Sequence, residues 1–236
     1  MSQRDRPLLA VLIDADNIPA KFAQAVMKEI TSLGEPGLRR VYGDWSSGQL
    51  RGWSDKVLEL GLVAHQETAN TKGKNASDIG LVIDAMDVLH TGRFDAFVLV
   101  SSDSDFTRLA SRIREEGLEV IGIGEGKAPE SLRNVCNRFI MIENIVDEPQ
   151  PEAGGRAASR KQQPQDALPL ILRAMERMDQ DDEWYALGAL GSQIVAEAPD
   201  FDTRTYGKRK LSDLVGEIKR LETRMQGTQM MVRRVD

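Results

Sequence analysis

The 236-residue chain has very little cysteine and histidine, which narrows the kinds of site it can contain. Its single cysteine, Cys136, excludes an internal disulfide and any zinc site built from several cysteines. Its two histidines, His65 and His90, are 25 positions apart, without the short spacing typical of a metal-binding pair. If the chain binds a metal ion, we therefore expect oxygen ligands, which favour Mg²⁺ or Mn²⁺.

Long apolar segments are also missing. The apolar run Leu8–Ile13 is shorter than the core of a signal peptide and is followed directly by Asp14. No stretch approaches the roughly 20 apolar residues that a helix needs to cross a bilayer. These absences predict a cytoplasmic protein with no membrane contact.

An excess of positive charge is missing as well, since the formal net charge is −6. Residues 1–150 contain 17 Lys and Arg against 23 Asp and Glu. This balance argues weakly against nucleic acid as a partner. Net charge, however, governs long-range attraction and does not determine the charge within a single cleft. A carboxylate site would itself supply several of the negative charges and could meet phosphate through a metal ion.

Short apolar runs alternate with amphipathic segments up to about residue 146. Continuous apolar runs are typical of strands that are covered on both faces. Their alternation with helices predicts an α/β fold, a Rossmann-like sandwich around a parallel sheet. The expected strands are Leu8–Ile13, Arg40–Gly43, Leu62–His65, Ala96–Val100, Val120–Ile123 and Phe139–Ile142.

The chain is expected to form two domains, residues 1–146 and 165–236. Residues 147–164 contain three prolines and two glycines but no large apolar side chain, which indicates a flexible linker. The second domain shows three amphipathic helices and a tail, Leu221–Val235, with Gly227 at its middle. Three helices and a β-hairpin predict a small winged-helix domain.

Acidic residues follow two of the expected strands. Asp14 and Asp16 end the first, while Asp103 and Asp105 follow Ala96–Val100. Ligands of open parallel sheets bind beyond the carboxyl ends of the strands, so both pairs would face one crevice if these strands are neighbours. Each acid could instead only cap the helix that follows it.

Asp78 is unusual because it lies at the centre of the apolar arc of an expected helix, residues 76–90. A buried charge is costly unless it is paired or bound to metal. On the same helix, Asp84 and Asp87 fall on the narrow polar face, which predicts that both are solvated.

These observations predict a divalent-metal site for phosphate chemistry. Closely spaced carboxylates repel one another, and a divalent cation relieves that repulsion and activates water. The candidate ligands are Asp14, Asp78, Asp103 and Asp105. Four nearby side chains could contact substrate, namely Asn17, Ser101, Ser102 and Lys74. Trp45 and Trp53 could stack on bases or pack against the sheet, and Gly122, Gly124 and Gly126 form only a weak phosphate-loop pattern.

Three segments together resemble the NYN domain, a PIN-like nuclease family, in its bacterial LabA-like branch. They are LIDADNIP, KNASDIGLVIDAMD and VLVSSDSDFTRLASRIREEG, and the resemblance covers roughly residues 7–145. It implies a Rossmann-like fold and a divalent-metal ribonuclease site at Asp14, Asp78, Asp103 and Asp105. Asp84 also matches a recurring acid of the family.

The second domain, with the segment FDTRTYGKRKLSDLVGEI, resembles a LOTUS (OST-HTH) domain, which implies RNA binding. Basic groups at a helix amino terminus suit phosphate contacts. The candidate residues are Arg204, Tyr206, Lys208, Arg209 and Lys210. The alternative is a solvated basic turn, since residues 165–236 hold 11 basic and 13 acidic residues.

The sequence thus predicts a metal-dependent ribonuclease with an RNA-binding module, and it is compatible with a homo-oligomer. One alternative is a phosphotransferase of the haloacid-dehalogenase type, with Asp14 as nucleophile and Asp16 as acid and base. That family has Thr or Val where this chain has Ile18. The other alternative is an RNA-binding adaptor without catalysis.

Overall fold

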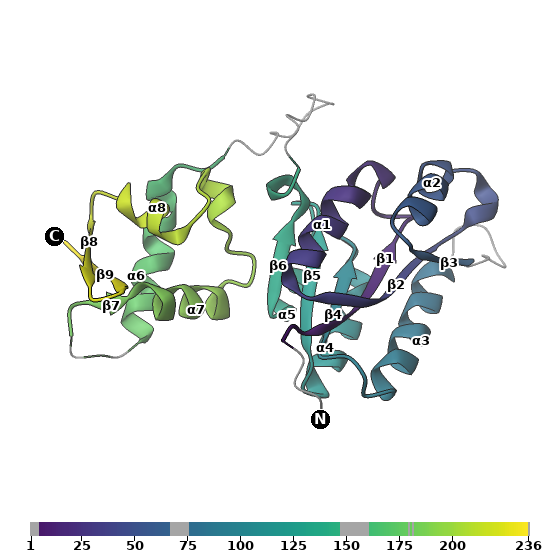
Figure 1. The fold of residues 1–236 in the computed structure, drawn as a ribbon, viewed down its shortest axis with the longest axis horizontal. Helices are drawn as coiled ribbons and strands as arrows, with labels where there is room; N and C mark the ends of the chain where they lie inside the picture. Colours follow the sequence, from purple (N-terminus) through teal and green to yellow (C-terminus); the bar gives the residue numbers. More distant parts are fainter. Residues whose placement is uncertain (1–4, 67–75, 147–160, 179, 181, 236) are drawn as a thin grey trace. The chain divides into compact units, whose positions relative to one another are not determined.

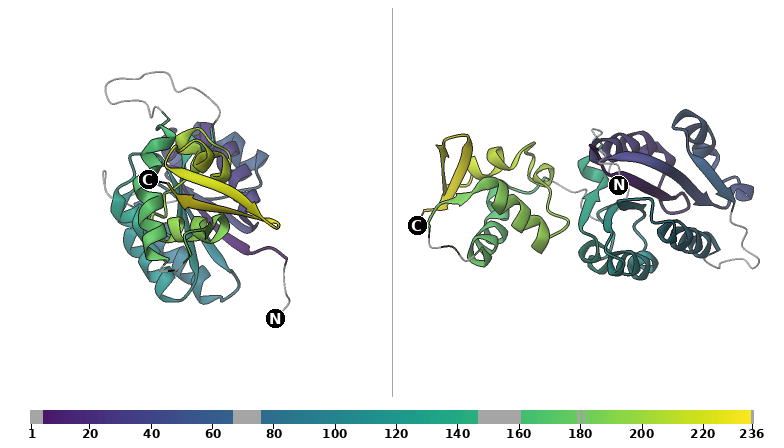
Figure 2. Two further views of the ribbon diagram at one scale, coloured as in Figure 1. Left: turned by 90° about the vertical axis from the view of Figure 1, so that its left-hand side faces the viewer. Right: turned by 60° about the horizontal axis from the view of Figure 1, so that its bottom comes forward.

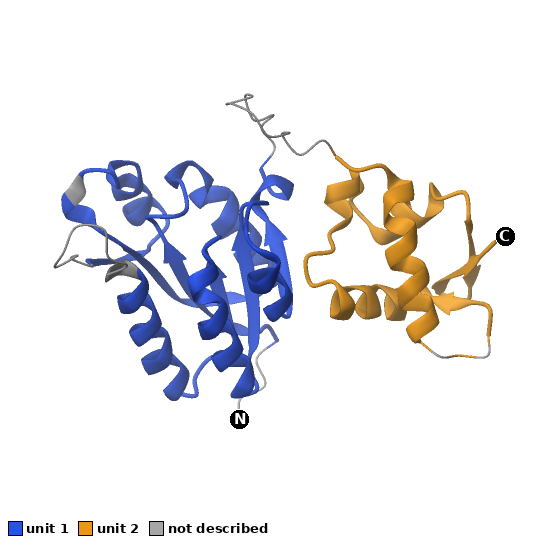
Figure 3. Cartoon of the chain, turned by 180° about the vertical axis from the view of Figure 1, so that it is seen from behind, with its two compact units in different colours: residues 1–146 blue, residues 147–236 orange. Residues whose placement is uncertain are grey.

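The computed structural model describes residues 5–66, 76–146, 161–178, 180 and 182–235. The chain divides into two compact units, Met1–Val146 and Asp147–Asp236 (Figure 3). Most of the predicted linker, residues 147–160, lies outside the described residues. Its last part packs within the second unit, where the backbone N–H of Gln162 donates to the carbonyl of Thr205 at 2.9 Å.

The first unit is built on a parallel sheet of six strands in the order β3-β2-β1-β4-β5-β6. The predicted α/β Rossmann-like architecture is confirmed. The strands are β1 (Leu8–Asp14), β2 (Glu35–Gly43), β3 (Val63–Gln66), β4 (Ala96–Val100), β5 (Glu119–Gly124) and β6 (Arg138–Met141). The longer helices are α1 (Ala23–Leu33), α2 (Arg51–Glu59), α3 (Ala76–His90), α4 (Thr107–Glu115) and α5 (Glu130–Val135).

Helices cover both faces of this sheet, which explains the continuous apolar runs. Figure 2 shows α1 and α2 on one side and α3, α4 and α5 on the other. Within β1, Leu9 and Val11 join the core beneath α1, while Ala10 and Leu12 join the core beneath α3 and α4. All four are fully buried. A strand with two buried faces cannot alternate with polar residues.

The strand order reverses between β1 and β4, the two central strands, so the topological switch point of the sheet lies between them. The chain runs from β1 outward to β2 and β3, then returns through α3 to β4 on the other side of β1 (Figure 1). Ile13 pairs with Val100, so the residues that follow each strand are neighbours at the carboxyl edge. The strands that precede the two acidic clusters are therefore neighbours, as the expectation of a shared crevice requires.

The second unit has helices α6 (Leu168–Arg177), α7 (Leu187–Glu197) and α8 (Leu211–Gly216), and a small antiparallel sheet in the order β7-β9-β8. The strands are β7 (Tyr185–Ala186), β8 (Leu221–Gln226) and β9 (Gln229–Arg234). Gly227 has a φ of 61° and forms the turn between β8 and β9. The predicted small domain of helices and a hairpin is confirmed. None of the described helices is long and apolar enough to cross a membrane.

Candidate active site at the carboxyl edge of the sheet

Asp14 ends β1 and is only 3% exposed. Its two carboxylate oxygens are held separately. The hydroxyl of Ser101 donates to Oδ2 at 2.8 Å, and the backbone N–H of Asn17 donates to Oδ1 at 3.1 Å. Burial raises the pKa of Asp14 from its ordinary value of 3.8 to about 7, although both hydrogen bonds oppose that shift. The site therefore contains a carboxylate that burial keeps partly protonated at neutral pH.

Asn17, Ser101 and Ser102 connect the carboxyl ends of β1, β4 and β5. The side-chain oxygen of Asn17 accepts from the backbone N–H of Ser102 at 3.0 Å. The Ser102 hydroxyl oxygen accepts from the backbone N–H of Glu125 at 2.8 Å. These bonds fix the loops after β1, β4 and β5 relative to one another. A direct role of these three side chains in holding substrate stays a prediction.

Three acidic side chains converge beside this network. Asp78 lies in the first turn of α3, and Asp103 and Asp105 lie in the loop and 3-10 helix (Ser104–Phe106) after β4. One carboxylate oxygen from each lies within 4.8 Å of those of the other two. Asp103 is held in place because its backbone N–H donates to the Ser101 hydroxyl at 3.1 Å, and its Oδ1 accepts from the Asp105 N–H at 3.0 Å.

The negative charges of this cluster repel one another. The pKa of Asp78 is raised, first by burial and then by the negative charges of Asp103, Asp105 and Asp16. Three carboxylates from two separate segments offer only oxygen donors, which suits Mg²⁺ or Mn²⁺. A divalent cation among them would remove the repulsion. The residues that are present therefore fit such an ion.

Asp14 lies beside this cluster and is not one of the three converging acids. Its carboxylate is coupled to the cluster through the charge of Asp78, which contributes to its raised pKa. The structure thus brings the four predicted ligands to one edge of the sheet, but it separates a buried acid from three more open ones.

Asp16 is not among the predicted ligands, although the sequence places it with Asp14 at the carboxyl edge of the sheet. It is exposed, and its charge raises the pKa of both Asp14 and Asp78. The two-residue spacing of Asp14 and Asp16 after a buried strand is the signal that places both at this edge.

The prediction that Asp84 is solvated was wrong. Its carboxylate accepts a hydrogen bond from the Tyr42 hydroxyl and forms an ion pair with Arg40. Both partners project from β2, which packs beside this face of α3. Asp87, one turn further along α3, is exposed as predicted. Lys74, the remaining predicted substrate contact, lies outside the described residues.

The predicted basic turn of the second unit is partly neutralised by its own carboxylates. Arg204 donates several hydrogen bonds to Asp202, the shortest at 2.7 Å, and Lys208 forms an ion pair with Glu217. Tyr206 is half-buried, with its ring centroid 5.9 Å from that of Phe201. The other two members of the turn, Arg209 and Lys210, are exposed. RNA binding by this turn stays a prediction.

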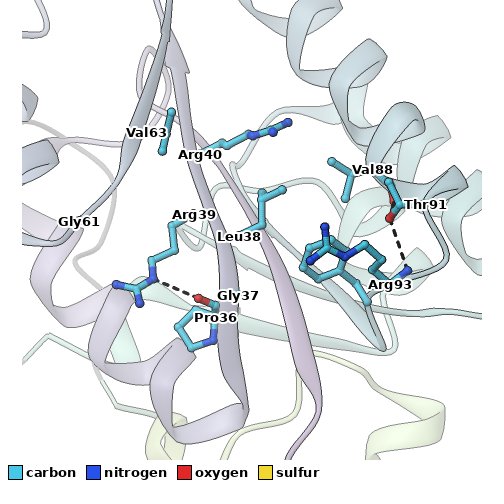
Figure 4. A pocket seen from close by; sticks show the side chains of 11 residues that line it. Pro36, Gly37, Leu38, Arg39, Arg40, Gly61, Val63, Val88, Thr91 and Arg93 are labelled. Atoms are coloured by element: carbon cyan, nitrogen blue, oxygen red, sulfur yellow. Dashed lines mark hydrogen bonds between the residues drawn. The ribbon is translucent and has the colours of Figure 1, made fainter. Parts of the chain in front are cut away.

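A pocket of about 640 Å³ lies away from the acids, between β2, the start of β3 and the segment that joins α3 to β4 (Figure 4). Three arginines line it, and two of them make hydrogen bonds or ion pairs within the first unit. Arg39 donates to the carbonyls of Pro36 and Leu60 at 3.1 Å, and Arg40 pairs with Asp84. This pocket takes no part in the acidic site.

Comparison with known proteins identifies both units. The family model of the NYN domain matches residues 8–143, more than half of the chain, and that of the OST-HTH/LOTUS domain matches residues 159–232. No curated protein matches the chain in sequence.

Among solved structures, one similar chain is described as a protein of unknown function, VPA0982 from Vibrio parahaemolyticus RIMD 2210633. It has 20% identity and a TM-score of 0.52 over 60% of this chain and 96% of the other, which supports the fold alone. MurG from Acinetobacter baumannii follows, with 12% identity and a TM-score of 0.39 over 75% of this chain and 50% of its own.

Proposed function

Because the chain belongs to the NYN domain family of PIN-like nucleases and carries an OST-HTH/LOTUS domain, we propose that it is a divalent-metal-dependent ribonuclease that hydrolyses RNA phosphodiester bonds. The observation that carries the proposal is the convergence of Asp78, Asp103 and Asp105 within 4.8 Å at the edge where ligands of such sheets bind. Among the residues that the structure describes, this is the group of acids suited to a metal ion.

In this proposal Asp78, Asp103 and Asp105 hold Mg²⁺ or Mn²⁺. When bound, such an ion activates a water molecule and stabilises negative charge on a transferring phosphoryl group. The chain supplies the positioning. Ser101 links Asp14 to the backbone of Asp103 through one hydroxyl group, which donates to the first and accepts from the second. The acids of β1 and of the loop after β4 are therefore fixed relative to one another before substrate arrives.

The fourth acid of the proposed mechanism is Asp14. Its carboxylate is orientated by Ser101 and Asn17 and coupled to Asp78. Without a cation, burial keeps its pKa near the neutral range, so a nearby positive charge would draw it into its ionised form. Asp14 would then contribute more negative charge to the site when an ion is bound than when the site is empty. This arrangement limits the repulsion that the empty site must tolerate.

The phosphotransferase alternative is less compatible with this geometry. A nucleophilic aspartate needs an accessible, ionised oxygen. Asp14 is 3% exposed, both its oxygens accept hydrogen bonds, and its pKa is raised to about 7. The adaptor alternative makes a different prediction, namely RNA binding that is unaffected by loss of the acids.

The decisive experiment measures cleavage of single-stranded RNA and single-stranded DNA by the purified chain with Mg²⁺, with Mn²⁺ and with a chelator. We expect metal-dependent cleavage of RNA. Asp103→Asn should lower the rate by more than the roughly 10- to 100-fold that is typical when only an outer partner of a metal site is lost. Asp87→Asn is the matched control, since Asp87 is an exposed acid of the helix that carries Asp78.

Two results would overturn the proposal. One is the absence of cleavage by the folded wild type with either metal. The other is an unchanged rate in Asp103→Asn. RNA binding that persists in that variant, without cleavage by wild type, would support the adaptor.

A further inference from the structure

Trp184 is in contact with two arginines of the second unit. The guanidinium carbon of Arg224 is 4.0 Å from the centroid of the Trp184 ring, and that of Arg233 is 4.8 Å away. Trp45 and Trp53 of the first unit donate their indole N–H groups to backbone carbonyls and pack into the core. Within the part of the chain that the structure describes, the indole N–H of Trp184 has no such acceptor.

The two arginines project from one face of the small sheet. In the register of β8 and β9, Glu222 pairs with Arg233 and Arg224 pairs with Met231. Val232, between the two β9 residues, points to the opposite face and is fully buried in the helical core. The helices thus cover the Val232 face of the sheet, and Arg224 and Arg233, with Trp184 against them, lie on the opposite face.

Positive charge is concentrated on this hairpin. Residues 219–234 contain five basic residues and one acidic residue, whereas residues 165–218 contain six basic and eleven acidic ones. The basic residues are Lys219, Arg220, Arg224, Arg233 and Arg234. The hairpin therefore carries an excess of positive charge within an otherwise acidic unit, and Glu183 and Glu222 offset part of that charge beside Arg233.

The two arginines differ in how far the protein already neutralises them. Arg233 pairs with Glu222 at 2.7 Å and with Glu183 at 3.4 Å. Arg224 is exposed, and it donates a long hydrogen bond of 3.5 Å to the side-chain oxygen of Gln226. Among the described residues it has no carboxylate partner. By contrast, Arg204 and Lys208 of the basic turn are both paired with acids.

We propose that this face, which we call the Trp184 face and define as Trp184, Arg224 and Arg233, binds single-stranded RNA. One base takes the place of the Arg224 guanidinium on the Trp184 ring, and the displaced Arg224 contacts an adjacent phosphate. Arg233, held by its two glutamates, keeps the indole in position. Aromatic rings accept the flat face of any base, so this contact selects unpaired bases over duplex and not one sequence. The inference rests on the proposed function and names where the second unit holds the RNA.

The test uses the full chain carrying Asp103→Asn, so that RNA is bound without being cut. The probe is a labelled single-stranded RNA of mixed sequence, about 12 nucleotides long, comparable to the site of one small binding domain. Fluorescence anisotropy gives the Kd at several salt concentrations. Trp184→Ala should weaken binding roughly 5- to 100-fold, as expected for one stacked base. Trp184→Tyr should retain most of the affinity.

Arg224→Gln separates the phosphate contact from stacking. It should weaken binding and reduce the slope of log Kd against log salt by about 0.7, the value for one phosphate contact on a single strand. Arg173→Gln is the matched control, because Arg173 is an exposed arginine of α6 away from the hairpin. It should change neither quantity. If Trp184→Ala lowers Tm strongly, the Arg224→Gln result decides, because Arg224 lies on the exposed surface.

The inference is overturned if Asp103→Asn binds RNA and folded Trp184→Ala and Arg224→Gln bind it equally well, or if duplex RNA binds as tightly as the single strand. It is also overturned if wild type cleaves RNA while Asp103→Asn binds none. A wild-type chain that neither binds nor cleaves RNA would instead overturn the proposed function itself.

Discussion

The hydroxyl group of Ser101 donates a 2.8 Å hydrogen bond to Asp14, and this bond joins the carboxyl ends of the two central strands. It lowers the pKa of Asp14, but burial raises that pKa more, to about 7. The folded chain therefore stabilises the protonated form of Asp14 relative to the unfolded chain. The ionised form of Asp14 therefore lowers the stability of the folded chain.

Asp14→Asn should increase the free energy of unfolding at pH 8 in the absence of divalent metal. The pKa of Asp14 is higher in the folded chain than its ordinary 3.8, so the folded state binds more protons between about pH 4 and pH 7. The wild type consequently loses stability as pH rises through that window, and the Asn variant does not. The gain at pH 8 should be on the order of 2–4 kcal/mol.

Urea unfolding at several pH values measures this difference. Below about pH 4 the two chains should be equally stable, since Asp14 is then protonated in both states. Asp87→Asn, on the exposed face of α3, should show no comparable gain. A variant Asp14→Asn that is less stable than wild type at every pH would contradict the assignment of the raised pKa to Asp14.

Millimolar Mg²⁺ or Mn²⁺ should raise the Tm of the wild type. A ligand that binds only the folded state stabilises it by about 2.7 kcal/mol when its concentration is 100 times its Kd. For a chain of this size that corresponds to roughly 5–10 °C. Asp103→Asn should lose the shift. Its stability should otherwise be kept, because asparagine can accept the same hydrogen bond from the Asp105 N–H.

Thermal denaturation with and without metal, at constant ionic strength, gives the comparison. Asp87→Asn should retain the full shift. An equal shift in wild type, Asp103→Asn and Asp78→Asn would show that the ion binds elsewhere and would remove the converging acids as its ligands.

The strands that build the site could be predicted because burial on both faces leaves a clear mark in the sequence. Asp14 and Asp103 follow such strands, and Asp78 lies on the buried arc of its own helix, so each could be placed from local pattern alone. The NYN and OST-HTH/LOTUS resemblances are confirmed for the same reason, since their motifs lie in continuous segments.

Long-range partners could not be predicted in this way. The polar face of α3 looked solvated because the helix pattern does not include Arg40 and Tyr42 of β2, which satisfy Asp84. Trp184 went unnoticed because its two arginines lie on a hairpin far along the chain. Strand β7 has only two residues and is defined by its pairing with β9. The local sequence therefore does not predict it.

Asp84→Ala should destabilise the first unit by about 1–3 kcal/mol. The substitution leaves the Tyr42 hydroxyl, on a fully buried residue, and the Arg40 guanidinium without their acceptor. Tyr42→Phe should cost less, about 1 kcal/mol, because it removes a donor and leaves the ion pair. The double variant should be less destabilised than the sum of the two single ones, since both remove one contact.

Urea denaturation of the four chains measures this coupling. Asp87→Ala is the control on the same helix and should lie within about 0.5 kcal/mol of wild type. Additive effects of Asp84→Ala and Tyr42→Phe would mean that the hydrogen bond between these residues contributes nothing to stability.

Gly124→Ala should damage both stability and cleavage. A Cβ atom at Gly124 would lie 2.6 Å from the backbone carbonyl oxygen of Ser101 and 3.0 Å from the Phe139 ring. The carbonyl oxygen cannot move unless the end of β4 moves, and that end carries the loop to Asp103. We expect a loss of about 1–3 kcal/mol from overpacking, together with a reduced cleavage rate. Glycine is therefore required in this strand for close packing, which accounts for part of the GxGxG pattern without any bound phosphate.

Gly126→Ala provides the matched control from the same pattern. The nearest atom to a Cβ there is a carboxylate oxygen of Glu143 at 3.4 Å, at the end of a flexible side chain. This variant should keep its stability within about 0.5 kcal/mol and should cleave RNA at the wild-type rate. If Gly126→Ala abolished cleavage while Gly124→Ala left it intact, the glycines would act on substrate directly, and the packing explanation for β5 would be wrong.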